Sequence, residues 1–240
     1  MRQTPLPSFD QRVILFAGAY GSGKTEVSVN YAMQLATSQN LPITIIDLDI
    51  VNPYFRSREA AFELETYGVR VIMPPNEQCY ADLPIILPEI RGEIERSEGK
   101  VVIDVGGDDA GARVLSSLAD AFVPLGYEFL MVLNARRPFT SDVAGSLKMM
   151  RDIETSSRLK LTGIVSNTHL IGETTAQTVT EGYKLAFEVG KAAALPVVFV
   201  SAIIQVVEQL DANVVTAPVF AMSRRMLKPW EEKAKAVRGL

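Results

Sequence analysis

The apolar residues of this chain gather in short continuous runs, and the segments between the runs have apolar residues at helical spacing. Six runs are typical of strands buried on both faces of a sheet, and they cover residues 13–17, 43–46, 101–103, 128–133, 161–166 and 197–200. A shorter strand is expected at 69–73. The spacing between the runs predicts helices over 25–38, 59–67, 83–98, 112–121, 141–157, 173–194 and 203–210.

Strand and helix alternate along the whole chain without a linker or a shift in composition. This order predicts an α/β protein with three layers, α/β/α, around a mostly parallel sheet of six or more strands. We expect residues 1–240 to form a single domain, with 1–11 as a lead-in that carries no function.

The loop after the first predicted strand carries the strongest motif. It fits G-x-x-x-x-G-K-[ST] at every fixed position, with the residues Gly18, Ala19, Tyr20, Gly21, Ser22, Gly23, Lys24 and Thr25. Strand, glycine loop and helix N-terminus in this order aim several backbone N–H groups at one point, which suits a polyphosphate. Lys24 can reach the β- and γ-phosphates and the Thr25 hydroxyl can reach Mg²⁺. The motif predicts a nucleotide site with a magnesium ion.

Acidic residues follow two other predicted strands. Asp47 and Asp49 come after 43–46, and Asp104 comes after 101–103 with Gly107 three positions later, the D-x-x-G pattern of nucleotide switches. Because ligands bind at the carboxyl ends of parallel strands, these acids belong to the edge that carries the glycine loop. We expect Thr25, Asp47 and Asp104 around the metal and the Gly107 N–H near the γ-phosphate. The alternative for Asp47 and Asp49 is a strand-end turn capped by Asp.

The base-binding end is predicted after 161–166, where Asn167-Thr168-His169-Leu170 follows. Many guanine-binding P-loop proteins have N-K-x-D here, with the Asp accepting hydrogen bonds from the guanine ring. Leu170 replaces that Asp, which favours ATP over GTP and makes Asn167 the expected base contact. His169 has no second histidine or cysteine beside it in the sequence, so we interpret it as a loop residue and not as a catalyst.

Two arginine pairs leave alternatives open. Arg56 and Arg58, near Asn52, either contact a nucleotide or substrate or pair with neighbouring glutamates. Arg136 and Arg137 follow 128–133, where a solvated loop and a substrate or partner contact are equally open. A stripe of apolar and basic residues over 219–238 predicts a terminal helix that packs on the sheet, and membrane attachment through it is not favoured.

Composition narrows the classes of function. The net charge of −4 gives no reason to expect nucleic acid as a partner. One cysteine and one histidine exclude a disulfide framework and a Cys/His metal cluster. This composition indicates a reducing, cytoplasmic setting, and no apolar run reaches the ~18 residues that a membrane span requires.

These motifs together resemble the SIMIBI-type P-loop NTPases, and within them the MinD/ParA-like ATPases, which include nitrogenase iron protein and several metallocentre assembly factors. The resemblance rests on Gly18 to Thr25, on Ile46 to Ile50, on Val102 to Gly107 and on the strand-end Asn167. It implies catalytic roles for Lys24, for Asp49, which would help to position the attacking water, and for Asp104, which would serve Mg²⁺.

The chain departs from this family at two places. MinD and ParA proteins usually have a lysine after the first glycine of the loop, and this lysine reaches the partner's nucleotide across a dimer interface. Here the position is Ala19, so we do not expect an ATP-bridged dimer, and the sequence leaves the oligomeric state open. The cysteine pair that holds an iron–sulfur cluster in the iron protein is also missing.

The expected function is therefore slow hydrolysis of Mg-ATP, with the nucleotide state regulating an unidentified protein partner. An ATP-dependent small-molecule kinase or ligase is the alternative, because related P-loop folds transfer phosphate to metabolites. The arginines would then bind an anionic acceptor. A third interpretation is a nucleotide-dependent binding module with negligible turnover.

Overall fold

The computed structural model describes residues 7–48, 58–73, 88–96, 98–106 and 109–225. Its centre is a sheet of eight strands in the order β3-β2-β4-β1-β5-β6-β7-β8, in which every neighbouring pair is parallel. The strands are β1 (Val13–Ala17), β2 (Ile43–Leu48), β3 (Val69–Ile72), β4 (Lys100–Val105), β5 (Tyr127–Leu133), β6 (Gly163–Ser166), β7 (Val197–Ile203) and β8 (Val219–Met222). The predicted α/β fold with a mostly parallel sheet is confirmed.

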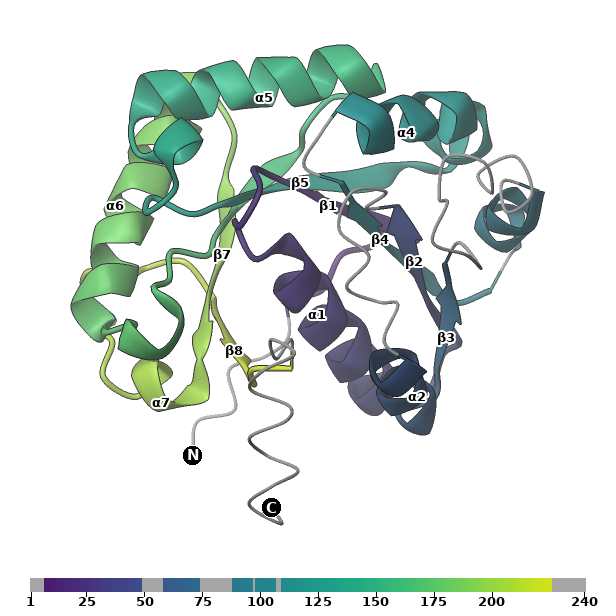
Figure 1. Cartoon of the computed structure of the whole chain (residues 1–240), viewed down its shortest axis with the longest axis horizontal. Helices are drawn as coiled ribbons and strands as arrows, with labels where there is room; N and C mark the ends of the chain where they lie inside the picture. Colours follow the sequence, from purple (N-terminus) through teal and green to yellow (C-terminus); the bar gives the residue numbers. More distant parts are fainter. Residues whose placement is uncertain (1–6, 49–57, 74–87, 97, 107–108, 226–240) are drawn as a thin grey trace.

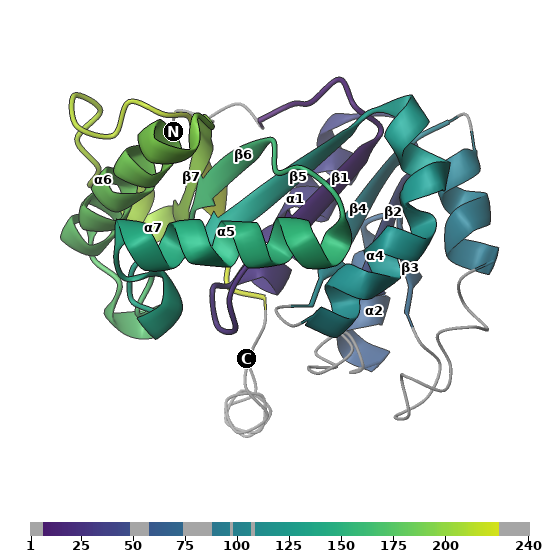
Figure 2. The same cartoon turned by 90° about the horizontal axis from the view of Figure 1, so that it is seen from above.

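Helices cover both faces of this sheet, as Figures 1 and 2 show. They are α1 (Lys24–Ser38), α2 (Arg58–Thr66), α4 (Asp109–Phe122), α5 (Val143–Ser157), α6 (Ala176–Ala193) and the short α7 (Ile204–Val207). Residues 88–95 are also helical. Three 3₁₀ turns join these elements: η2 (Val123–Leu125), η3 (Pro138–Thr140) and η4 (Ile171–Glu173).

Strand β1 shows how the two faces are filled. Val13 and Leu15 pack into the core beneath residues 88–95, α4, α5 and α6, whereas Ile14 and Phe16 pack into the core beneath α1 and α2. All residues of β1 are buried, because successive side chains of a strand point to opposite faces and both faces are covered. This is why the strand is a continuous apolar run in the sequence.

One expectation about the C-terminal region is wrong. We expected helical spacing from residue 219, but Val219–Met222 forms β8, which pairs with the open edge of β7 in the register Val200↔Val219. Phe220 and Met222 are buried while Val219 and Ala221 are half-buried, the two-residue alternation of a strand. Pairing with a free sheet edge prevails here over the helical spacing, and the remainder of the expected helix, from residue 226, lies outside the described residues.

The helix predicted from residue 173 begins at Ala176. Thr175 caps it, since the Thr175 side chain accepts from the Thr178 backbone N–H and the Thr178 side chain accepts from the Thr175 N–H. Within the part of the chain described here, no helix is long and apolar enough to cross a membrane.

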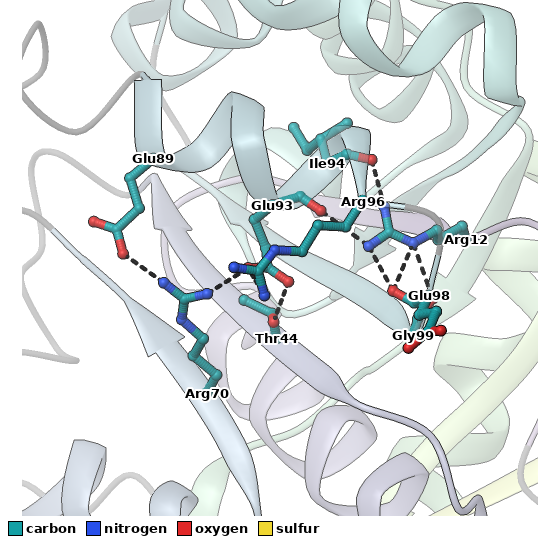
Figure 3. A network of polar contacts seen from close by, with 9 residues as sticks. All are labelled: Arg12, Thr44, Arg70, Glu89, Glu93, Ile94, Arg96, Glu98 and Gly99. Atoms are coloured by element: carbon teal, nitrogen blue, oxygen red, sulfur yellow. Dashed lines mark hydrogen bonds and ion pairs between the residues drawn. The ribbon is translucent and has the colours of Figure 1, made fainter.

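A polar network holds residues 88–95 against the sheet (Figure 3). The buried Glu93 carboxylate accepts from Thr44 Oγ1 at 3.0 Å and from Arg70 at 2.6 Å. Arg12, just before β1, donates to the backbone carbonyls of Glu93, Ile94, Glu98 and Gly99 and so satisfies the end of this helix.

Replacing Thr44 with valine tests this network. The change keeps the shape of the side chain but removes a donor from a buried carboxylate, so we expect the free energy of unfolding to fall by about 1–2 kcal/mol. Thr37→Val is the control, because the Thr37 hydroxyl bonds an exposed carbonyl within α1. Urea unfolding measures the free energy of unfolding of both variants. Equal values for the two would show that the Thr44–Glu93 contact contributes nothing to stability.

Candidate functional site

The glycine loop follows β1 at the carboxyl edge of the sheet and opens into a cavity of about 680 Å³. The loop forms one wall, and the residues after β6 and β7 form the others. The lining includes Lys24, Thr25, Arg137, Asn167, His169, Ser201, Ile203 and Gln205. This cavity is large enough for a nucleotide-sized ligand.

The loop has the shape that a polyphosphate requires. Gly23 has φ +83° and immediately precedes α1, and a Cβ there would lie 2.4 Å from Asn167 Nδ2, so no other residue fits without a shift of the loop. No side chain caps the N-terminus of α1, which leaves the N–H groups of its first turn available to an anion. Ser22 Oγ is buried and has no hydrogen-bond partner among the described residues. These features fit a bound phosphate chain.

The residues beside the loop fit a magnesium ion. Asp104, at the end of β4, is fully buried, and its Oδ2 accepts from Thr25 Oγ1 at 2.6 Å. Asp47 on β2 lies opposite Asp104 in the parallel register and is also buried. Hydroxyl and carboxylate oxygens are the ligands that Mg²⁺ prefers, usually completed by phosphates and water. The structure thus brings together Thr25, Asp47 and Asp104, the three predicted metal residues.

Asn167 supports the loop from behind. Its Nδ2 donates to the Ser22 carbonyl at 2.8 Å and its Oδ1 accepts from Ser201 Oγ at 2.9 Å. One amide hydrogen remains for a ligand, so a base contact by Asn167 stays a prediction. Ser201, on β7, could not be predicted as a site residue, because a single serine inside an apolar strand carries no motif.

His169 lies in the cavity wall, close to Gly23. Its Nδ1 accepts from the Ile171 N–H at 3.4 Å, an arrangement that leaves the proton of the neutral ring on Nε2. Burial, and then the positive charges of Arg137 and Arg224, lower the pKa of His169 to about 4. The ring is therefore a neutral donor at pH 7. The sequence placed His169 in a loop, and the structure places that loop at the site.

The arginines after β5 point to different places. Arg136 is exposed and pairs with Glu181 on α6, whereas Arg137 is half-buried and its Nε donates to the Gly21 carbonyl at 2.6 Å. Arg136 is thus the solvated loop residue, and Arg137 is the one that contacts the site.

Several predicted site residues lie outside the described residues, namely Asp49, Gly107, Asn52 and Arg56. Ala19 is buried in the loop, and Tyr20 beside it is 73% exposed. In the described part of the chain, no group of three or more His, Cys, Asp or Glu side chains could hold a metal by itself. The metal site therefore depends on the hydroxyl–carboxylate pair and on what a ligand adds.

Comparison with known proteins gives matches at the level of structure. No protein-family model and no curated protein matches the sequence. FtsY of Thermotoga maritima matches with a TM-score of 0.57 and 16% identity over 83% of this chain and 65% of that chain. The signal recognition particle receptor FtsY of Elizabethkingia anophelis, solved with GDP, matches with a TM-score of 0.53 and 17% identity over 83% of this chain and 59% of that chain. Chloroplast FtsY of Physcomitrella patens matches with a TM-score of 0.51 and 17% identity over 82% of this chain and 61% of that chain.

The chain shares the α/β fold of these FtsY structures. It spans about three fifths of the length of these solved structures. The predicted resemblance is confirmed at this level, and the finer MinD/ParA-like assignment is not decided by it. In this fold, the loop of residues 18–25, Asp104 and Asn167 lie at the ends of β1, β4 and β6, at one edge of the sheet.

The pKa of His169 gives a measurable test of how this edge of the sheet affects a charge. Because folding lowers the His169 pKa from about 6.5 to about 4, the unfolded chain binds a proton first as the pH falls. The His169 contribution to stability is complete above pH 6.5 and is lost as the pH falls toward 4, on the order of 3 kcal/mol in total. Between pH 6.5 and 4, the free energy of unfolding of His169→Gln should therefore fall less than that of the parent protein.

An NMR titration of the imidazole signal tests this directly, since the chain has one histidine. A midpoint well below pH 6.5 is expected in the unliganded protein. A midpoint at or above 6.5 would show that the ring is solvated and does not face Arg137 and Arg224.

Proposed function

We propose that this protein binds Mg-ATP at the loop of residues 18–25, hydrolyses it slowly, and uses the bound nucleotide to regulate a protein partner, as MinD/ParA-like ATPases do. The observation that carries the proposal is the Thr25–Asp104 hydrogen bond of 2.6 Å, which Thr25 donates to a fully buried carboxylate, beside a glycine loop whose following helix has no side-chain cap. A hydroxyl on the phosphate loop and a carboxylate on the next strand are the protein's usual contribution to a magnesium–nucleotide site.

Each residue has a distinct part in this chemistry. Lys24 is buried at the first turn of α1 and balances the negative charge of the phosphates. Thr25 and Asp104 would hold Mg²⁺, directly or through water, and the ion would neutralise charge on the phosphate oxygens. Asp49, which follows β2, would orient the water for in-line attack.

The cavity lining supports the choice of ATP. Glu26 is the acidic residue among the described lining residues, and its Oε1 already accepts from the Arg225 N–H and from Asn30 Nδ2. A guanine ring needs a carboxylate facing its donors, and Leu170 takes the place where one is expected. The Gln205 amide lines the cavity and can both donate and accept, as the adenine edge requires. The GDP in the Elizabethkingia structure belongs to that protein.

Competition binding tests the base preference. ATP should displace a fluorescent nucleotide at lower concentration than GTP, because Leu170 stands where the carboxylate that pairs with the guanine N1 and N2 donors is expected. Equal affinities, or a preference for GTP, would contradict the assignment of residues 167–170 as an adenine-type loop while leaving nucleotide binding intact.

A regulatory partner is supported by exposed apolar side chains around the site. Tyr20, Phe139 and Leu170 are 73%, 67% and 43% exposed, and they follow β1, β5 and β6, three adjacent strands. Large apolar side chains left in water beside a ligand site are typical of a protein-contact surface. Of the arginines that a small-molecule kinase would use for an anionic acceptor, Arg136 is paired with Glu181 and does not line the cavity, whereas Arg137 does.

Three substitutions separate the roles within the site. Lys24→Ala should weaken ATP binding by about 100-fold or more, since it removes a charge-assisted contact to the phosphates. Asp104→Asn should make binding less dependent on Mg²⁺ and slow the turnover. Asp49→Asn should leave affinity unchanged and slow hydrolysis by ~10²-fold or more. Calorimetry with and without Mg²⁺, followed by phosphate release, measures all three variants.

An Asp49→Asn variant that hydrolyses ATP at the parent rate would reduce Asp49 to a strand-end cap. Tight binding with no turnover by the parent protein, with or without cell-extract metabolites, would favour the binding-module interpretation. ATP consumption that requires an added metabolite would favour the kinase or ligase.

A further inference from the structure

Arg137 is the one basic residue of the loop after β5 that reaches the phosphate site. Its Nε donates to the Gly21 carbonyl at 2.6 Å, and its guanidinium packs against the open face of Gly21. A Cβ at Gly21 would lie 2.9 Å from Nε and 3.2 Å from Cζ. The glycine, at φ +73°, thus allows the arginine to approach the loop closely.

The neighbouring arginine shows that this placement is specific. Arg136 and Arg137 are adjacent in the sequence, yet Arg136 turns outward to the Glu181 carboxylate. The loop itself is fixed, because Asn134 Oδ1 accepts from the Arg136 N–H at 2.9 Å and Thr140 Oγ1 donates to the Asn134 carbonyl at 2.8 Å. Both the Asn134 and the Thr140 side chains are fully buried. Arg137 is therefore held at the phosphate loop by a rigid support.

The charge of Arg137 has no carboxylate partner among the described residues, where no salt bridge includes it. After burial, its positive charge is a second cause of the lowered pKa of His169, which lines the same cavity. A guanidinium has five N–H donors, and the Gly21 carbonyl uses the one on Nε. No described residue accepts from the four terminal N–H groups, which can therefore bind an anion in the cavity that Arg137 lines.

We propose that Arg137 contacts the phosphates of the bound nucleoside triphosphate from within the same chain and stabilises the charge that develops when the terminal phosphate is transferred. This inference rests on the proposed nucleotide function and assigns a catalytic residue to it. A water oxygen forms a bond to the γ-phosphorus as the bond to the β–γ bridging oxygen breaks. The electron pair and negative charge go to the diphosphate, and the water proton is released with the phosphate.

An arginine in this position has a known physical effect. Charge spreads over the terminal phosphate oxygens and the leaving oxygen in the transition state, and a guanidinium fixed beside them lowers the barrier. An arginine supplied by the same chain needs no partner for this step. It acts most strongly on a triphosphate and only weakly on a diphosphate, which lacks the terminal group.

The test compares Arg137→Ala with Arg136→Ala as the matched control. ATP and ADP affinities are measured by calorimetry, and hydrolysis is measured in single-turnover experiments with Mg²⁺. For Arg137→Ala we expect about a tenfold loss of ATP affinity or more, less change for ADP, and hydrolysis slower by ~10²-fold or more. Arg136→Ala should match the parent protein. Arg137→Lys keeps the positive charge but replaces the planar guanidinium with a compact ammonium group. Relative to Arg137→Ala, it should therefore recover more of the ATP affinity than of the hydrolysis rate.

The outcomes separate this inference from the function on which it rests. A parent protein that binds no nucleotide overturns both. A parent protein that binds and hydrolyses ATP, with Arg137→Ala equal to Arg136→Ala, overturns the role of Arg137 alone. Equal losses of ATP and ADP affinity together with a lower melting temperature of the unliganded variant would show that Arg137 only supports the loop. If Arg137→Ala does not fold, the ATP-to-ADP affinity ratio of Arg137→Lys decides, and a ratio equal to that of the parent overturns the proposal.

Discussion

The parallel pairing of β1 with β4 is the constraint on which the site depends. It sets Phe16 opposite Asp104 in the register, so β4 ends where the glycine loop begins to turn into α1. Thr25, on the first turn of α1, then lies within hydrogen-bond distance of Asp104. A slip of one residue would turn Asp104 to the other face of the sheet, and the buried apolar side chains on both faces of β1 prevent it.

The sequence predicted the parts of this arrangement that depend on short-range patterns. The motif at Gly18 to Thr25 needs local backbone geometry only, and the acids at strand ends follow from the direction of the strands. Strand β8 was not predicted, because Val219–Met222 becomes a strand only when the edge of β7 is present to pair with it. Ser201 and the different orientations of Arg136 and Arg137 also depend on tertiary contacts, which spacing along the chain does not encode.

The site combines a concentrated positive charge with few exposed carboxylates. Lys24 and Arg137 line one cavity, burial and then the charges of Arg137 and Arg224 lower the pKa of His169, and Asp104 accepts a hydrogen bond from Thr25. Such a cavity gains most from a ligand with several negative charges and a divalent cation. Two side chains support the loop directly: Asn167, after β6, donates to the Ser22 carbonyl, and Arg137, after β5, donates to the Gly21 carbonyl. Ser201 on β7 in turn holds the Asn167 side chain. These contacts hold the loop in the conformation that the proposed phosphate site requires.

The most direct test of this account is a crystal structure with Mg²⁺ and a non-hydrolysable ATP analogue. The account predicts the β-phosphate inside the turn of residues 18–25, the metal beside Thr25 and Asp104, and the adenine in the cavity walled by His169 and Ile203. A nucleotide bound elsewhere on the protein, or a glycine loop that stays empty at saturating analogue, would contradict it.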